Sequence, residues 1–123
     1  MKDYSGDSKR VLQDKSYSFA LRIVKLYNYL KDTKSEYVLS KQILRAGTAI
    51  GALVSESEFA QSKPDFAHKL SISLKEANET RYWLRLMKDS KLITEEEFNS
   101  INTDIEQLIR LLVASIKTAK KND

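Results

Sequence analysis

The residues best suited to chemistry in this sequence are carboxylates, and two of them, Glu76 and Glu79, are spaced to share one face of a helix. Di-metal centres in helical bundles take a glutamate from each of two helices and a Glu-x-x-His motif from each of the other two. The chain has one histidine, His68, and the only related pattern is Asp65-x-x-His68. We therefore expect neither a metal site nor a cofactor.

The chain also lacks the residues that usually serve nucleophilic catalysis and phosphate-binding loops. The chain has no cysteine, which excludes thiolate nucleophiles, disulfides and thiolate metal ligands. A single histidine in an ordinary context offers no Ser-His-Asp arrangement, and no glycine-rich phosphate loop occurs. We expect a protein that is not an enzyme.

The acidic residues are better explained as partners of bases on a neighbouring helix. If the chain reverses direction at residues 62–63, Arg45 comes within about one turn of two acids that are three residues apart. The predicted structural ion pairs are Arg45 with Glu79 or Glu76, and Glu56 with Lys69.

A row of bases continues along the same segment. Arg81, Arg85 and Lys88 lie about one turn apart, beside Tyr82 and Trp83. Bases next to aromatic rings can hold phosphates and stack nucleobases, but charged rows also serve simply as solvated faces. On the nucleic-acid interpretation these three bases are the first candidates for phosphate contact, and a second candidate patch consists of Lys15, Arg22 and Lys25.

The overall charge favours an anionic partner. The formal net charge is +4, and acids outnumber bases only in residues 94–123. The chain begins with polar residues and has no apolar run near the ~20 residues that span a bilayer, so we expect a cytoplasmic protein.

Small residues recur every four positions at Gly47, Gly51 and Ser55. Glycine in a helix costs about 1 kcal/mol relative to alanine, so two glycines on one strip indicate that another backbone passes close by. That neighbour is either a helix of the same bundle or a helix of a second subunit.

Apolar spacings of three and four residues predict four helices, about 8–32, 37–61, 64–89 and 95–119. The connections near residues 62 and 92 are short, and each carries an N-cap signal, Ser62 before Pro64 and Thr94 before Glu97. Short connections join antiparallel neighbours. The sequence therefore predicts one domain, residues 1–123, that is an all-α antiparallel up-down four-helix bundle.

Two of the predicted helices carry more apolar residues than one buried stripe needs. Trp83 and Leu86 lie on a second side of one, and Ile109 and Val113 widen the stripe of the other. The surplus is explained either by a buried homo-oligomer face or by a wider core stripe.

Two ordered motifs resemble those of a known family. Leu39-Ser40-x-Gln42-Ile43-Leu44-Arg45-Ala46 opens the first, and Ser73-Leu74-x-Glu76-x-x-Glu79-Thr80 forms the second. Over about residues 10–116 the chain resembles the four-helix bundle proteins encoded in intervening sequences of bacterial 23S rRNA genes, often labelled S23 ribosomal protein. It is also similar to accessory proteins of diversity-generating retroelements.

The resemblance implies a homopentameric ring of four-helix bundles with a role in binding RNA or other nucleic acid. We therefore expect a non-enzymatic, homo-oligomeric module that binds structured nucleic acid. The alternative is a protein–protein adaptor ring that docks a nucleic-acid-processing enzyme.

Overall fold

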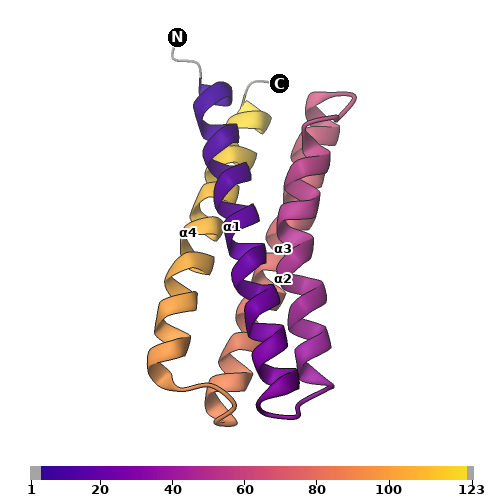
Figure 1. The fold of residues 1–123 in the computed structure, drawn as a ribbon. Coiled ribbons are helices and arrows are strands. Elements are labelled where there is room, and N and C mark those ends of the chain that lie inside the picture. Colours follow the sequence, from indigo (N-terminus) through magenta and orange to yellow (C-terminus); the bar gives the residue numbers. More distant parts are fainter. Residues whose placement is uncertain (1–3, 122–123) are drawn as a thin grey trace.

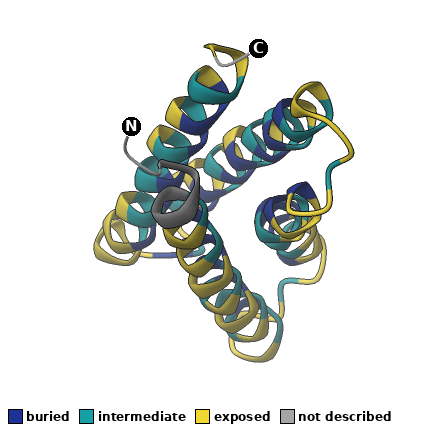
Figure 2. Cartoon of the chain, turned by 90° about the horizontal axis from the view of Figure 1, so that it is seen from above, coloured by how far each residue is buried: buried dark blue, intermediate teal, exposed yellow. Residues whose placement is uncertain are grey.

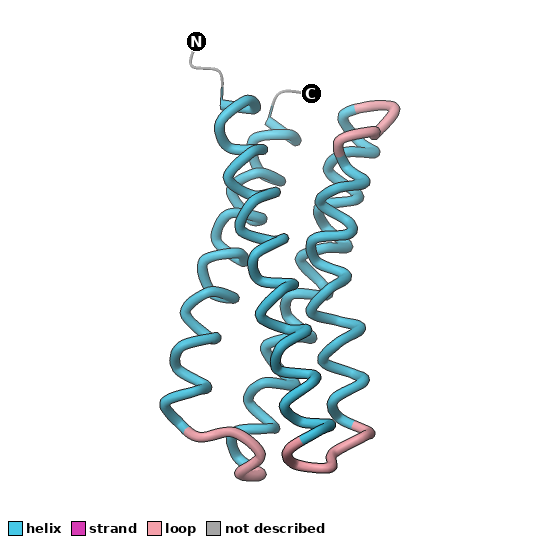
Figure 3. Tube along the Cα trace, viewed as in Figure 1, coloured by secondary structure: helices cyan, strands magenta, loops and turns pink. Residues whose placement is uncertain are grey.

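The computed structural model describes residues 4–121 and consists of four long helices (Figure 1). Their bounds are α1 (Tyr4–Asp32), α2 (Leu39–Ser57), α3 (Lys63–Asp89) and α4 (Glu95–Lys121). Within that range no strand is present (Figure 3). The predicted all-α four-helix bundle is confirmed, whereas the ends of the predicted domain 1–123 lie outside the described residues.

Each helix runs antiparallel to the one before it, and the inward faces are buried (Figure 2). The α1–α2, α2–α3 and α3–α4 interfaces are extensive, and the α1–α4 interface is the smallest of the four. None of the described helices combines the length and apolar composition needed to cross a membrane.

One apolar core is shared by all four helices. Its members touch one another along the bundle axis, and burying each large aliphatic side chain contributes about 1.5–3 kcal/mol. The largest fully buried apolar side chains are Phe19, Ile23, Leu30, Ile43, Ile50, Leu70, Leu84, Met87, Ile105, Leu108 and Leu112.

The second helix is shorter than predicted. It ends at Ser57 rather than near residue 61 because the chain tightens there into a turn. The amides of Glu58, Phe59 and Ala60 each donate to the carbonyl three residues earlier, which is the tighter geometry often seen at helix ends.

The caps predicted for α3 and α4 are present. Ser62 Oγ accepts a hydrogen bond from the Asp65 amide at 3.1 Å. Thr94 and Glu97 form a reciprocal capping box, with hydrogen bonds of 2.8 and 3.0 Å. These caps fix where α2 turns into α3 and where α3 turns into α4.

The start of α2 is stabilised by Glu36, which lies between the helices predicted at about 8–32 and 37–61. The Glu36 carboxylate accepts hydrogen bonds from the amides of Val38, Leu39 and Ser40 at 3.2, 2.9 and 2.7 Å. Burial of the carboxyl group raises its pKa, but these three donors outweigh that effect and lower the pKa of Glu36 below its ordinary value.

The glycine strip packs against a helix of the same bundle. A Cβ added to Gly47 would lie 2.7–2.9 Å from the side-chain carbons of Ile23. A Cβ on Gly51 would lie 3.1 Å from the carbonyl oxygen of Ser16. Ser55, the third residue of the strip, is exposed. The two glycines thus let α1 approach α2, and Ser55 lines a groove between the same two helices together with Gly51.

We expect Gly47→Ala to lower the free energy of unfolding by about 1–3 kcal/mol, because a new methyl group would overlap the buried Ile23. This loss exceeds the gain of about 1 kcal/mol in helix propensity. Urea denaturation of the variant measures the change. In an Ile23→Ala background the methyl group has room, so the same substitution should become neutral or stabilising. Destabilisation of equal size in both backgrounds would exclude this contact as the cause.

We expect Glu36→Gln to destabilise the protein at pH 7 by about 1 kcal/mol, the usual size of an N-terminal cap. A carboxyl whose pKa is lower in the folded state stabilises the fold above its unfolded pKa, and that contribution is lost as the pH falls. The difference between wild type and variant should therefore shrink between about pH 5 and 3. Unfolding free energies measured across that range would show it, and a pH-independent difference would contradict it.

Candidate nucleic-acid interface

A groove runs between the outer faces of α3 and α4. The turn between them places the second half of α3 opposite the first half of α4, and the groove has a volume of about 400 Å³. The lining residues are Asn78, Arg81, Tyr82 and Arg85 from α3, with Phe98, Asn102 and Glu106 from α4. Two of the three bases predicted for phosphate contact are therefore in this groove.

Arg81 forms part of the groove wall and already has partners. Its guanidinium donates to the Glu106 carboxylate at 3.0 Å and to the Asn78 side-chain oxygen at 3.1 Å. The side chains of Arg81 and Glu106, which form the ion pair, are both partly exposed. Arg81 is thus held in one orientation, and its charge is partly compensated by α4.

Arg85, Tyr82 and Asn78 are the exposed members of the groove, and Arg85 and Tyr82 are the charged and the aromatic one. Arg85 is exposed and has no ion-pair partner among the described side chains, those of residues 9–121. Tyr82 is 60 % exposed, and its ring meets that of Trp83 edge-on at a centroid distance of 5.2 Å. Trp83 is fixed in turn, because its indole N–H donates to Glu79 at 3.0 Å.

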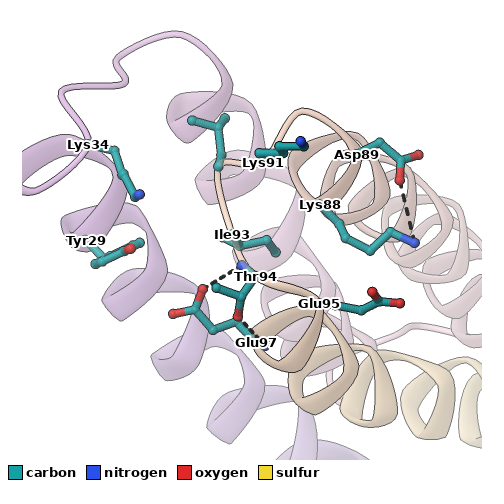
Figure 4. Close-up of a pocket in the computed structure, with 10 residues that line it drawn as sticks. Tyr29, Lys34, Lys88, Asp89, Lys91, Ile93, Thr94, Glu95 and Glu97 are labelled. Carbon is teal, nitrogen blue, oxygen red and sulfur yellow. Dashed lines mark hydrogen bonds and ion pairs between the residues drawn. The ribbon is translucent and has the colours of Figure 1, made fainter.

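Lys88 lies beyond the groove, toward the end of the bundle. Its ammonium group is 4.7 Å from the centre of the Phe98 ring and 3.6 Å from the Asp89 carboxylate. It lines a separate cavity of about 520 Å³ together with Lys34, Lys91, Glu95 and others (Figure 4). Acids and bases mix there, so Lys88 does not extend a purely basic row.

The second predicted patch is divided by the fold. The guanidinium of Arg22 bridges to α4, where it lies 2.7 Å from the Asp104 carboxylate and 3.0 Å from the Ser100 hydroxyl. Arg22 and Lys25 both line a cavity between α1 and α4, whereas Lys15 is exposed outside this cavity. The cavity also contains Glu96 and Glu97, which makes it less suited to a polyanion.

The charged residues between α2 and α3 are paired as predicted from the sequence. Arg45 donates to both Glu76, at 3.3 Å, and Glu79. Lys69 donates to Glu56 at 3.3 Å. These ion pairs are partly exposed and each contributes little individually, about 0–1 kcal/mol.

Metal binding finds no support in the arrangement of side chains. Over the described part of the chain, no three residues among the acids and His68 lie close enough together to hold a metal ion. His68 itself is exposed on the first part of α3.

Comparison with known proteins identifies the family. The family model for the 23S rRNA-intervening sequence protein matches residues 9–114. The chain belongs to this family. Among solved structures, a protein of unknown function from the S23 ribosomal protein family of Bacteroides thetaiotaomicron shares 52 % sequence identity and a TM-score of 0.88. The match covers 89 % of this chain and 98 % of that one. Among curated proteins no match was found.

The motifs that resemble the family's sequence mostly build the α2–α3 interface. Ser73 Oγ donates to the Ile50 carbonyl of α2 at 2.9 Å, and Ser73 is fully buried. Thr80 Oγ1 donates within α3 to the Glu76 carbonyl, and Glu76 pairs with Arg45. In this member of the family these residues hold the scaffold together, and the α3–α4 groove lies outside them.

The α4 side of the groove was not predicted from the sequence: Phe98, Asn102 and Glu106 are additional partners of the α3 row. The turn at residues 90–94 carried the necessary signal, because folding α4 back along α3 at that point brings Glu106 opposite Arg81.

Proposed function

We propose that this protein is a non-enzymatic, homo-oligomeric cytoplasmic module that binds structured RNA or other nucleic acid through the outer face of α3 and α4. The observation that carries the proposal is the pair formed by Arg85, exposed and without an ion-pair partner in the described structure, and the exposed ring of Tyr82 beside it. A guanidinium can hold phosphate oxygens in a bidentate manner, and an aromatic ring offers a surface to bases.

Charge and family membership support the same function. The net charge of +4 attracts polyanions, and the field grows when several copies assemble. The family is described by its relation to 23S rRNA genes. The proposed binding face lies on α3 and α4, apart from the cavity between α1 and α4, where Glu96 and Glu97 offset the charges of Arg22 and Lys25.

For assembly, the outer face of α1 and α2 is the favoured surface. Tyr17, Leu21 and Val24 lie on one side of α1 and are 67, 51 and 40 % exposed. Tyr17 also lines a groove of about 460 Å³ between α1 and α2, together with α2 residues such as Ala52. An apolar face of this kind on a helical bundle is typical of a subunit contact, and its use would leave the α3–α4 face free.

Arg85→Gln should weaken binding to a folded RNA hairpin and reduce the slope of log K against log salt by up to about one, because one phosphate contact is lost. Fluorescence anisotropy across a salt series measures both quantities. Arg10→Gln, which removes an exposed base on α1, is the matched control and should change neither strongly. Equal effects of the two variants would show that Arg85 is not part of the interface. If the wild type fails to bind even at low salt, the adaptor function becomes the better hypothesis.

Leu21→Glu should dissociate the assembly, because it places a charge in the proposed apolar contact. Sedimentation velocity of wild type and variant at equal concentration measures the change. Val38→Glu, which alters a 70 % exposed residue in the α1–α2 connection, should leave the assembly intact. A monomeric wild type, or an undiminished oligomer in the Leu21→Glu variant, would contradict the proposed face.

A further inference from the structure

We infer that the α3–α4 groove is a stacking site for an unpaired nucleobase, with Tyr82 as the platform and Arg85 as the contact to the adjoining phosphate. The inference rests on the proposed nucleic-acid binding and specifies its ligand. That ligand is a single-stranded nucleotide, as found in the loops of folded RNA, rather than the paired interior of a duplex.

The Tyr82 ring is both accessible and held in place. It is 60 % exposed, yet it packs edge-on against Trp83 with an interplanar angle of 73°. Trp83 is itself hydrogen-bonded to Glu79, which is paired with Arg45 of α2. A ring ordered before binding loses little conformational freedom when a base stacks on it.

The guanidinium groups around the ring are arranged for two different tasks. Arg85 follows Tyr82 by three residues, so the two side chains are neighbours on the surface of α3. Arg85 is free of ion pairs in the described chain, which leaves its donors available to a phosphate. Arg81 is fixed by Glu106 and Asn78, so it shapes the wall of the groove beside the base.

The α4 side of the groove provides a polar group without a partner. The side-chain oxygen of Asn102 is buried and makes no hydrogen bond to the part of the chain whose side chains are described, residues 9–121. Buried acceptors normally have a partner. Since that oxygen is closed to a ligand, the part of Asn102 that can serve the groove is its amide N–H2 group, a donor suited to the ring nitrogen or carbonyl oxygen of cytosine.

The size and charge of the groove fit one nucleotide. Its volume of about 400 Å³ lies at the lower end of the range for small-ligand sites. Its only acid, Glu106, is occupied by Arg81. A duplex keeps the faces of its bases stacked inside, so the exposed aromatic ring would remain unused.

The test compares two single strands of equal charge, an oligocytidylate of about eight nucleotides and an abasic strand of the same length. RNA and DNA versions of both strands distinguish a ribonucleotide ligand from a deoxyribonucleotide ligand. We expect the base-bearing strand to bind about tenfold more tightly, the usual size of one stacking contact. We also expect it to quench the fluorescence of Trp83, the only tryptophan of the chain.

Variants of the platform assign the effect to the groove. Tyr82→Ala and Tyr82→Leu should abolish the preference for the base-bearing strand while leaving binding of the abasic strand unchanged, and Tyr82→Phe should retain the preference. Tyr37→Ala, which removes a 55 % exposed tyrosine outside the groove, is the matched control and should behave as wild type. Tyr82→Leu and Tyr82→Phe keep a large side chain if the alanine variant does not fold.

The outcomes separate this inference from the proposed function. Equal affinity of the wild type for both strands, or a preference that survives Tyr82→Leu, would overturn the stacking site and leave phosphate binding intact. Failure to bind either strand would also overturn it. In that case continued binding of the folded RNA hairpin would preserve the proposed function, and loss of hairpin binding as well would refute both.

Discussion

The close approach of α1 to α2 at Gly47 is the contact on which the arrangement of the bundle depends. Since no Cβ fits between Gly47 and Ile23, α1 can pack against α2 at this depth only if that position is glycine. On its other side α1 meets α4, and this α1–α4 interface is the smallest of the bundle, with a cavity of about 700 Å³ along it. A polar bridge from Arg22 to Asp104 and Ser100 spans this weaker interface.

This geometry explains why several basic residues are unavailable to a ligand. Arg22, Arg45 and Arg81 each lie beside a boundary between helices and reach across it to an acid of the neighbouring helix. An arginine in such a position has its charge partly compensated before any phosphate arrives. Arg85 lies on the same helix as Arg81 but reaches no acid in the described structure. The capacity of α3 to bind an anion therefore depends more on Arg85 than on the number of bases along the helix.

The sequence was sufficient for the fold and for the ion pairs next to a short turn. Helical periodicity and two capping signals predicted four antiparallel helices, and a reversal at residues 62–63 aligned Arg45 with Glu76 and Glu79. The bridge from Arg22 to α4 could not be found in this way, because no turn connects α1 to α4 and their relative register is set by packing. The cap formed by Glu36 was missed for another reason: its carboxylate bonds to amides two to four residues later, in a segment without periodicity.

The family motifs and the candidate site are connected through the hydrogen bond between Glu79 and Trp83. Glu79 accepts hydrogen bonds from Arg45 of α2 and from the indole of Trp83, and the Trp83 ring packs against Tyr82 at the edge of the α3–α4 groove. A chain of three contacts thus connects the α2–α3 interface to the groove. Loss of Glu79 would remove the acceptor of a partly buried indole N–H and free the ring against which Tyr82 rests. The acid at position 79 therefore has a positioning role toward the exposed aromatic surface in addition to its part in the scaffold.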